Sequence, residues 1–222
     1  MCDNKNMEKG TFLDSNIGEK IAKAFSSMYP FPKTELIHSS EYELAISVML
    51  SAQTTDKKVN QVTPNLFKKY PNWESLSNAN VSEVQNLIHD VNFYIGKGER
   101  LVKAAQFVIV NFGGTLPRTI EDLIKIPGIA RKSANVITQE LWNIAEGIVV
   151  DTHVTRVSQR LGLTKNLDPI KIEKDLMQII PKKYWRNFSG AVVLHGRYIC
   201  IARKPKCEEC KLNNICPSAF KV

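Results

Sequence analysis

Four cysteines close to the C-terminal end of the sequence have the residue type and the spacing of a metal centre. Cys200, Cys207, Cys210 and Cys216 form the pattern C-x6-C-x2-C-x5-C. Lysine, proline, glutamate and asparagine separate them, and these residue types do not pack a hydrophobic core. A short segment of this kind needs a cross-link to fold, and a reducing compartment favours metal over disulfides. The spacing alone permits a four-thiolate zinc site or an iron–sulfur cluster, and it leaves Cys2 without a metal to bind.

A second candidate site lies at residues 123–137, a stretch that predicts two helices joined by a tight turn. Pro127 and Gly128 end the first helix, and the second begins about three residues later with Lys132 in its first turn. The backbone N–H groups at such a helix start can bind an anion such as phosphate. A lysine beside that anion has the chemistry of a nucleophile. The alternative interpretation is an ordinary surface lysine on a helix.

Asp151, nineteen residues after Lys132, is the third candidate. It follows an apolar run at 148–150 and precedes apolar residues at helical spacing, which is the place of an N-cap. A plain helix cap is one interpretation. A capping carboxylate is also held rigidly by backbone donors, which suits it to stabilise a developing positive charge. We interpret His153 and His195 as packed or hydrogen-bonded histidines rather than as catalysts.

Helices must position all of these residues, because apolar residues recur at helical spacing and no strong alternating run is found. We therefore predict an all-α protein. Pro64 is expected to kink or split its helix, and Asn80 with Glu83 resembles a capping box. The predicted helices cover residues 41–51, 56–70, 80–90, 99–112, 119–126, about 131–142, 151–162, 168–181 and 184–200.

Composition indicates a polyanionic partner. The chain has 30 lysines and arginines against 22 acidic residues, a formal net charge of +8. No acidic residue occurs from Leu176 through Cys207, a stretch with seven bases. A solvated basic face is the plain alternative, but together with a phosphate-binding turn the pattern favours nucleic acid. No apolar run approaches the ~18 residues of a membrane span, and the first ten residues resemble no signal or transit peptide, so we expect a cytoplasmic protein.

Taken together, these residues resemble the helix-hairpin-helix DNA glycosylases, and within them the endonuclease III family. The similarity covers nearly the whole chain from about Glu35. The motifs that carry it are Leu50-Ser51-Ala52-Gln53 with Asp56, the turn with Lys132, Val150-Asp151-Thr152-His153, Leu194-His195-Gly196-Arg197-Tyr198 and the four cysteines. The resemblance implies that Lys132 is the nucleophile, that Asp151 is its essential carboxylate, and that the cysteines bind a [4Fe-4S] cluster.

The resemblance also implies an activity and a domain organisation. The expected enzyme is a bifunctional DNA glycosylase and AP lyase of base excision repair, which removes oxidised pyrimidines and cleaves the strand by β-elimination through a lysine Schiff base. The expected domains are a helical barrel at 34–145, ending in the helix-hairpin-helix, and an iron–sulfur domain made of 1–33 and 146–222. The expected partner is double-stranded DNA with a damaged base or an abasic site, bound by a monomer at a bacterial-type nucleoid. Expected DNA contacts are Gln53, Phe93, Gly128, Ala130, Arg131, Arg203, Lys204 and Lys206.

Four positions depart from the family pattern, the mildest being Ser133 in place of a usual threonine. Ala130 stands where the family usually has the second glycine of its hairpin, which narrows the backbone freedom there. Asn92 and Ile95 stand where the family tends to have glycine and a polar residue, in a loop that helps to fill the gap left by an extruded base. Two alternatives to the bifunctional enzyme are a mismatch-specific monofunctional glycosylase and a non-catalytic helix-hairpin-helix protein with a structural metal.

Overall fold

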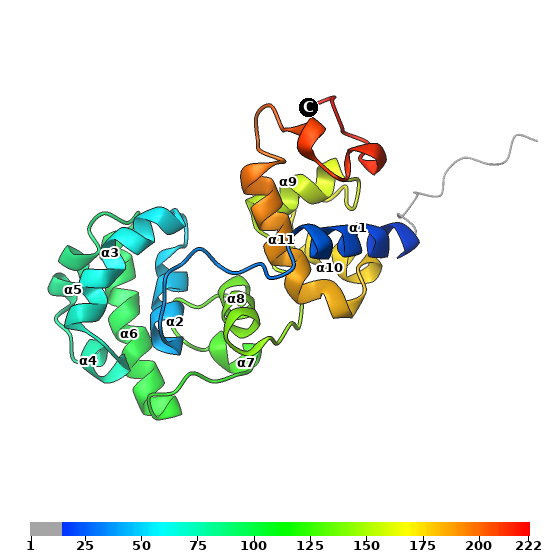
Figure 1. Ribbon diagram of the computed structural model, residues 1–222. Coiled ribbons are helices and arrows are strands. Elements are labelled where there is room, and N and C mark those ends of the chain that lie inside the picture. The colour runs from blue at the N-terminus through cyan, green and yellow to red at the C-terminus, as the bar shows by residue number, and fades with distance from the viewer. Residues whose placement is uncertain (1–14) are drawn as a thin grey trace, which may run out of the picture. The chain divides into compact units, whose positions relative to one another are not determined.

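The computed structural model describes residues 15–222, and within them every regular element is a helix (Figure 1). The prediction of an all-α protein is confirmed. The chain divides into two compact units: one contains Lys33–Glu146, and the other contains residues 15–32 together with Gly147–Val222. We call them the hairpin unit and the cysteine unit. Each has a hydrophobic core of its own.

The hairpin unit contains the helices α2 (Glu41–Leu50), α3 (Asp56–Lys69), α4 (Trp73–Ser77), α5 (Val81–Leu87), α6 (Tyr94–Phe112), α7 (Ile120–Leu123) and α8 (Arg131–Trp142). Almost every residue of α2 is buried, so this helix is the centre of the unit. α8 packs against both α2 and α7. At its far end, Trp142 Nε1 donates a hydrogen bond to Glu41 Oε1 at 3.0 Å. The helix that begins with Lys132 in its first turn is therefore fixed to the core.

Two predictions made from short sequence patterns were wrong in this unit. α3 runs through Pro64 without a break, because Pro64 lies on the exposed side, where water can bind the carbonyl that loses its helical partner. Asn80 caps α5 through the N–H of Ser82, and Glu83 binds the Tyr70 hydroxyl instead of closing a capping box.

Some predicted helix bounds were also wrong. α6 begins at Tyr94, five residues before the predicted start at Glu99, and α5 ends at Leu87 rather than near Asp90. The short helix α4 was not predicted. It is too short for an apolar period to mark it, although Asn72 closes a capping box at its start.

The cysteine unit contains α1 (Ser15–Met28), α9 (Thr152–Arg160), α10 (Pro169–Ile179) and α11 (Trp185–Tyr198), and the short 3-10 helices η1 (Lys182–Tyr184), η2 (Cys207–Glu209) and η3 (Asn213–Ile215). α1 packs against α10 and α11, and α11 packs against α9 (Figure 1). Phe25 and Phe188 meet edge to face with ring centroids 5.6 Å apart in this core. The helix starts predicted at Asp151 and Asp168 are confirmed as N-caps.

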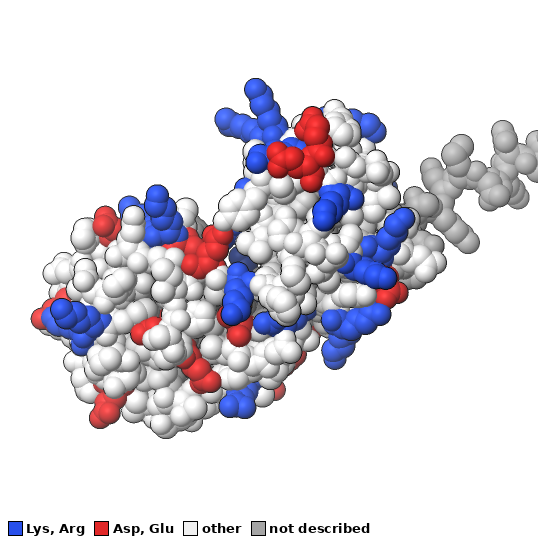
Figure 2. Space-filling view, in the orientation of Figure 1, with Lys and Arg blue, Asp and Glu red and all other residues white. Residues whose placement is uncertain are grey.

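Lys and Arg side chains protrude from much of the face of the cysteine unit that Figure 2 shows, and its acidic side chains on that face gather mainly near the C-terminal end. Part of the basic stretch is paired within the unit, since Lys183 lies 2.6 Å from Glu19 and Lys206 lies 3.8 Å from Glu209. None of the helices in residues 15–222 combines the length and the apolar character needed to cross a bilayer.

Candidate functional site

The hairpin (residues 124–130) joins α7 to α8 through contacts that are local in sequence. The Ile126 N–H donates to Leu123 O at 3.1 Å, and the Ile129 N–H donates to Ile126 O at 3.0 Å. Ile126 and Ile129 are buried, whereas Gly128 between them is exposed. Gly128 has a φ of +91°, a left-handed conformation that glycine adopts without strain. The predicted hairpin is confirmed, and it presents the backbone around Gly128 to solvent.

α8 begins without a side-chain cap. Ala130 is its N-cap residue, and the first turn holds no acidic residue. The N–H donors of this turn are therefore available to an anion, which the helix dipole also favours. Arg131 and Lys132 are both exposed in the same turn. A phosphate, a guanidinium and a lysine amine can thus meet at one helix end.

Ala130 causes no strain at this place. Its φ of −84° and ψ of 166° are extended values that any residue adopts. The hairpin needs glycine only at Gly128. The narrower backbone freedom expected of an alanine at this position therefore has no cost in this conformation.

Asp151 caps α9 in the cysteine unit. Its Oδ1 accepts a hydrogen bond from the Val154 N–H at 2.8 Å, and its own carbonyl accepts from the Thr155 N–H at 2.8 Å. The side chain is half-buried. The capping interpretation is correct, and the cap fixes a carboxylate at the start of a helix. Lys132 and Asp151 come from different units, so the helix ends that carry them are built independently.

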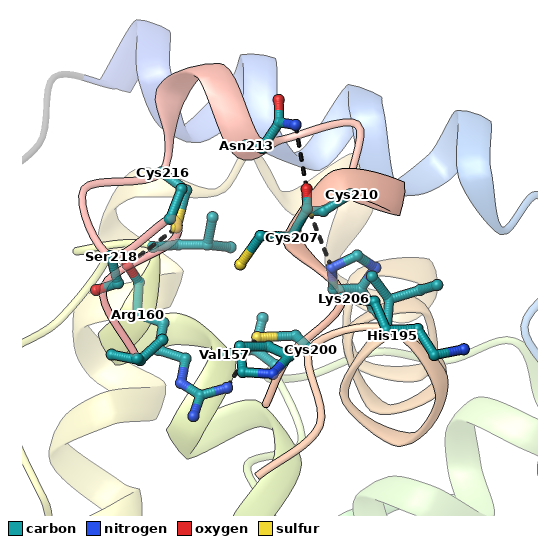
Figure 3. Close-up of a pocket in the computed structure, with 15 residues that line it drawn as sticks. Val157, Arg160, His195, Cys200, Lys206, Cys207, Cys210, Asn213, Cys216 and Ser218 are labelled. Carbon is teal, nitrogen blue, oxygen red and sulfur yellow. Dashed lines mark hydrogen bonds between the residues drawn. The ribbon is translucent and has the colours of Figure 1, made fainter. Parts of the chain in front are cut away.

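The four cysteines line a common cavity in the cysteine unit (Figure 3). Cys200 follows the end of α11, and the other three lie in the segment with η2 and η3. Burial raises the pKa of the Cys210 and Cys216 thiols. Within residues 15–222, no three His, Cys, Asp or Glu side chains are grouped closely enough to bind one metal ion, whereas all four cysteines line the same cavity. Four thiols on one cavity are compatible with a cluster of several atoms. Cys2, expected to bind no metal, lies outside the described residues.

Arginines that sequence reasoning missed hold the cysteine loop (residues 200–216) to α9. Arg160 donates to the carbonyls of Ile201 at 2.7 Å and Ala202 at 2.9 Å, and its Nη1 lies 3.4 Å from Cys200 Sγ. Arg156 Nε donates to the Cys200 carbonyl at 3.2 Å. Neither arginine stands out in the sequence, because a basic residue on a helix is usually a surface residue.

Both histidines have structural surroundings, as predicted. His195 is buried, and burial lowers its pKa to about 4, so it is neutral. Its Nδ1 lies 3.2 Å from the Tyr29 hydroxyl, and its Nε2 lies 3.4 Å from Cys210 Sγ. His153 Nδ1 lies 3.2 Å from Arg156 Nη2.

Gln53 and Phe93 lie on two turns of the hairpin unit and line one pocket. We call residues 51–55 the Gln53 turn and residues 91–94 the Phe93 turn. Both named residues are left-handed, with φ of 56° and 59°, and both are exposed. Asn92 and Lys97, which sequence reasoning did not assign to a site, connect the two turns. A lysine in a helical stretch gives no signal of burial, so only the structure identifies it.

Comparison with known proteins decides the family. Residues 46–182 match the HhH-GPD superfamily of base excision DNA repair proteins, and residues 200–216 match the iron–sulfur binding domain of endonuclease III. The endonuclease III of Synechocystis sp. is 44% identical over 200 residues, which cover 90% of this chain and 91% of that protein. The chain belongs to the endonuclease III family.

Solved structures of endonuclease III agree with this membership. A non-covalent endonuclease III–DNA complex matches with a TM-score of 0.86 at 35% identity, covering 93% of this chain and 97% of that chain. A trapped endonuclease III–DNA covalent intermediate matches with a TM-score of 0.87 at the same identity and coverage. The two-lobed helix-hairpin-helix glycosylase fold expected from the sequence is confirmed.

Membership decides the activity class and the cofactor. The chain is a bifunctional DNA glycosylase and AP lyase of base excision repair. Its cofactor is a [4Fe-4S] cluster, so the choice that cysteine spacing left open between zinc and iron–sulfur is decided for iron–sulfur.

Proposed function

We propose that Lys132 is the nucleophile and Asp151 the essential carboxylate of an enzyme that removes oxidised pyrimidines from double-stranded DNA. The observation that carries this proposal is the position of Lys132. It is exposed in the first turn of an uncapped helix, directly after a hairpin whose backbone is open to a phosphate. A lysine amine at this place can reach the sugar of a nucleotide whose phosphate the hairpin binds.

The reaction proceeds by covalent catalysis. The damaged nucleotide leaves the base stack, because the stacked duplex shields its C1′ atom. The neutral Lys132 amine attacks C1′, the bond from C1′ to the base breaks, and the base departs with a proton. The C1′–O4′ bond then breaks, the remaining Nζ proton passes to O4′, and a Schiff base is left between Lys132 Nζ and C1′. Loss of a proton from C2′ then expels the 3′ phosphate and cuts the strand.

Asp151 stabilises the positive charge that develops on the sugar while the base leaves. A carboxylate already held by the Val154 N–H needs little reorganisation when the charge appears. Capping and catalysis are therefore compatible roles of one side chain.

The remaining contacts position DNA without reading its sequence. We assign a phosphate to the backbone of Gly128 and Ala130 with the Arg131 guanidinium beside it. Gln53 and Phe93 enter the space that the extruded base leaves. Arg203, Lys204 and Lys206, all exposed in the cysteine loop, contact further phosphates.

The cysteine loop needs its cluster to hold these three basic side chains in place for DNA. We assign Cys200, Cys207, Cys210 and Cys216 as the ligands, and the bound cluster supplies a cross-link within a loop that has no core of its own. We further assign the hairpin unit as the helical-barrel domain and the cysteine unit as the iron–sulfur domain. The chain is proposed to act as a monomer on nucleoid DNA.

Borohydride trapping on abasic duplex tests the nucleophile. Lys132→Ala should abolish the trapped protein–DNA complex. Lys125→Ala is the matched control, since Lys125 is an exposed lysine of the same hairpin that pairs with Asp122 at 2.8 Å, and it should trap normally. Trapping by Lys132→Ala at the wild-type level would refute the assignment.

Asp151→Asn separates the carboxylate from the cap. Asparagine caps helices as well as aspartate does, so the variant should keep its melting temperature. The single-turnover rate of base removal should fall by about 10²–10³-fold, the loss typical of a removed electrostatic stabiliser. A variant that keeps both its stability and its rate would show that Asp151 is only a cap.

Iron content and visible absorption test the ligands. Serine at any of the four cysteines of the loop should lower both, whereas Cys2→Ser should change neither. Retention of full iron after substitution of one of the four would remove that residue from the ligand set.

A cleavage panel and a salt titration of DNA binding test the substrate. A panel of duplexes with oxidised pyrimidines, oxidised purines and mismatches should be cut fastest at oxidised pyrimidines. Replacing Arg203, Lys204 and Lys206 by Gln together should weaken DNA binding and reduce the dependence of log K on log salt by about 0.9 for each lost phosphate contact. Lys182→Gln with Lys183→Gln is the control, and an equal change there would assign the effect to net charge alone. Light scattering tests whether the protein is a monomer in solution.

A further inference from the structure

Gln53 and Phe93 both adopt a backbone conformation that is unfavourable for their residue types. Their φ values of 56° and 59° lie in the left-handed region, where Cβ approaches the following carbonyl. Phe93 is also 67% exposed, so its ring gains little from burial. Such residues persist only where the surroundings determine the backbone. Two of them side by side on one pocket need a specific support.

The support comes from Asn92 in the Phe93 turn and from Lys97 in the first turn of α6. Asn92 Nδ2 donates a hydrogen bond to the Gln53 carbonyl at 2.6 Å. The Lys97 ammonium donates to the carbonyls of Leu50 and Ala52, each at 2.7 Å. It also donates to Thr54 Oγ1 at 3.0 Å. The Gln53 turn is therefore bound on both sides of Gln53 and at Gln53 itself.

Lys97 holds the second turn as well, through its main chain. Its backbone N–H donates to the Phe93 carbonyl at 3.0 Å and closes the first turn of α6. The side chain of Gln85 adds a further contact there, since its Nε2 donates to the Ile95 carbonyl at 3.0 Å. One residue thus joins both turns, with its backbone on one and its ammonium on the other.

The three hydrogen-bond acceptors around the Lys97 amine determine its role. All three protons of an ammonium are used, and the residue is only 5% exposed. An amine in this state is not free to attack a substrate. Lys97 is therefore a positioning residue and not a second nucleophile.

We propose that Lys97 and Asn92 lock Gln53 and Phe93 into one preformed pair that enters the duplex together when the damaged nucleotide leaves the stack. A pair fixed before binding loses less conformational entropy on insertion than two flexible turns would. Asn92 stands where the family tends to have glycine, so this chain adds a side-chain link between the two turns at a position where glycine offers none. The inference rests on the roles proposed above for Gln53 and Phe93.

A fluorescence measurement of base unstacking tests the proposal directly. A duplex with 2-aminopurine beside the lesion fluoresces when the stack opens, and a non-cleavable abasic analogue keeps the complex intact. Asn92→Ala should reduce the equilibrium constant for opening by about 5-fold, as expected for one lost hydrogen bond of ~1 kcal/mol. Lys97→Met should reduce it further. Asn92 is exposed, so its variant should fold even if Lys97→Met does not.

Asn60→Ala is the matched control. Asn60 is also an asparagine of the hairpin unit whose amide bridges distant backbone, donating to the Glu35 carbonyl at 2.8 Å, but it touches neither turn. It should leave unstacking unchanged. Equal losses in Asn60→Ala and Asn92→Ala would mean that only general stability had changed and would overturn the proposal.

A double-mutant comparison identifies the route of the effect. If Asn92 acts by fixing the Gln53 side chain, the loss of unstacking caused by Asn92→Ala should be much smaller in a Gln53→Ala background than in the wild-type background. Additive losses would show that Asn92 does not act through Gln53. Suppose that Asn92→Ala and Lys97→Met open the stack as well as the wild type does, while Gln53→Ala and Phe93→Ala clearly do not. This result would refute the positioning role of Asn92 and Lys97 and leave the role of Gln53 and Phe93 intact. If Gln53→Ala and Phe93→Ala also had no effect, the proposed role of the pair itself would fail.

Discussion

The hairpin and the pair of left-handed turns are irregular segments of the same unit, yet they are held in different ways. The hairpin bonds run between residues three apart, such as Ile129 to Ile126, and its one left-handed residue is Gly128. The two turns carry left-handed Gln53 and Phe93, and their supports join residues 39 to 47 positions apart in the chain. The hairpin is stable through its local backbone, whereas the turns depend on a buried charge.

This difference separates the tasks that we assign to the two segments. A phosphate is the same at every nucleotide, so a segment that binds one can rely on backbone donors and a favourable turn. A residue that enters the base stack has to be a side chain of some size, and glycine cannot serve there. The strain of a left-handed glutamine or phenylalanine is then offset by contacts from elsewhere in the fold.

Removal of the buried charge should have the largest effect. Lys97→Met leaves the Leu50 and Ala52 carbonyls without their donor, and each unpaired carbonyl costs about 1–3 kcal/mol. We expect the free energy of unfolding in urea to fall by about 2–4 kcal/mol. Lys103→Met is the control on the same helix, since Lys103 is exposed and lies 4.0 Å from Glu99, and it should change stability by less than ~0.5 kcal/mol. Similar losses in the two variants would contradict a structural role for Lys97.

A methyl group at the hairpin glycine should have a smaller effect. In Gly128→Ala the new Cβ would lie 2.8 Å from Met49 Cε, at a φ of +91° that disfavours alanine. Met49 is flexible and can move, so we expect a loss of about 1–2 kcal/mol in the free energy of unfolding. Gly113→Ala is the control, because Gly113 is also left-handed but has nothing within 4 Å of its Cβ position. A loss no larger than in Gly113→Ala would show that the Met49 contact is irrelevant.

The same contrast explains what could be predicted from the sequence. The hairpin, the Asp151 cap and the cysteine pattern depend on residue type and short spacing, so the sequence alone is enough to predict each of them. Asn92 and Lys97 were not predicted, because their function depends on partners some forty residues away. Asn92 was noticed only as a departure from the family pattern, without a role.

Fold class was predictable for a related reason, and helix bounds were less so. Apolar residues at helical spacing mark long helices such as α3 and α6, so the all-α class follows from repetition. The start of α6 does not follow from this repetition, because a left-handed Phe93 ends the preceding turn and no capping residue precedes Tyr94. Tertiary contacts from Lys97 fix this start, and no local rule contains them.

Raising the pH should relieve the cost of burying the Lys97 charge. Burial, with a smaller effect of Arg100, lowers the pKa of Lys97 to about 8, while a free lysine titrates near ~10.4. Between these values the unfolded chain binds the proton and the folded chain does not, so the free energy of unfolding should rise with pH. A neutral amine still donates two hydrogen bonds, so most of the support that Lys97 gives to the Gln53 turn should survive the titration.

The measurement is the difference in unfolding free energy between wild type and Lys97→Met, because other titrating groups cancel in it. This difference should grow in favour of the wild type from about pH 8 to ~pH 10.4. A difference that stays constant or shrinks over this range would mean that the bonds from Lys97 to its three acceptors, rather than its desolvation, dominate its titration.

The smallest effect is expected at Ala130, where the hairpin meets α8. Its extended backbone, with φ of −84°, needs no glycine. Ala130→Gly gains a slightly better N-cap but also more freedom in the unfolded chain, so the two effects should nearly cancel, within ~0.5 kcal/mol. Ala130→Ser should instead stabilise α8 by about 1 kcal/mol, because a serine hydroxyl can accept from the first turn.

DNA binding by these two variants should differ in an informative way. If the free N–H groups at the start of α8 bind a phosphate, Ala130→Ser supplies a competing acceptor and should weaken binding to abasic duplex even though it stabilises the protein. Ala130→Gly should bind within about twofold of the wild type, since it leaves the donors in place. Tighter binding by Ala130→Ser would show that these donors face no phosphate. A tenfold gain in Ala130→Gly would show that the hairpin changes its backbone on binding DNA, and the hairpin would then be the adaptable segment and the two turns the rigid one.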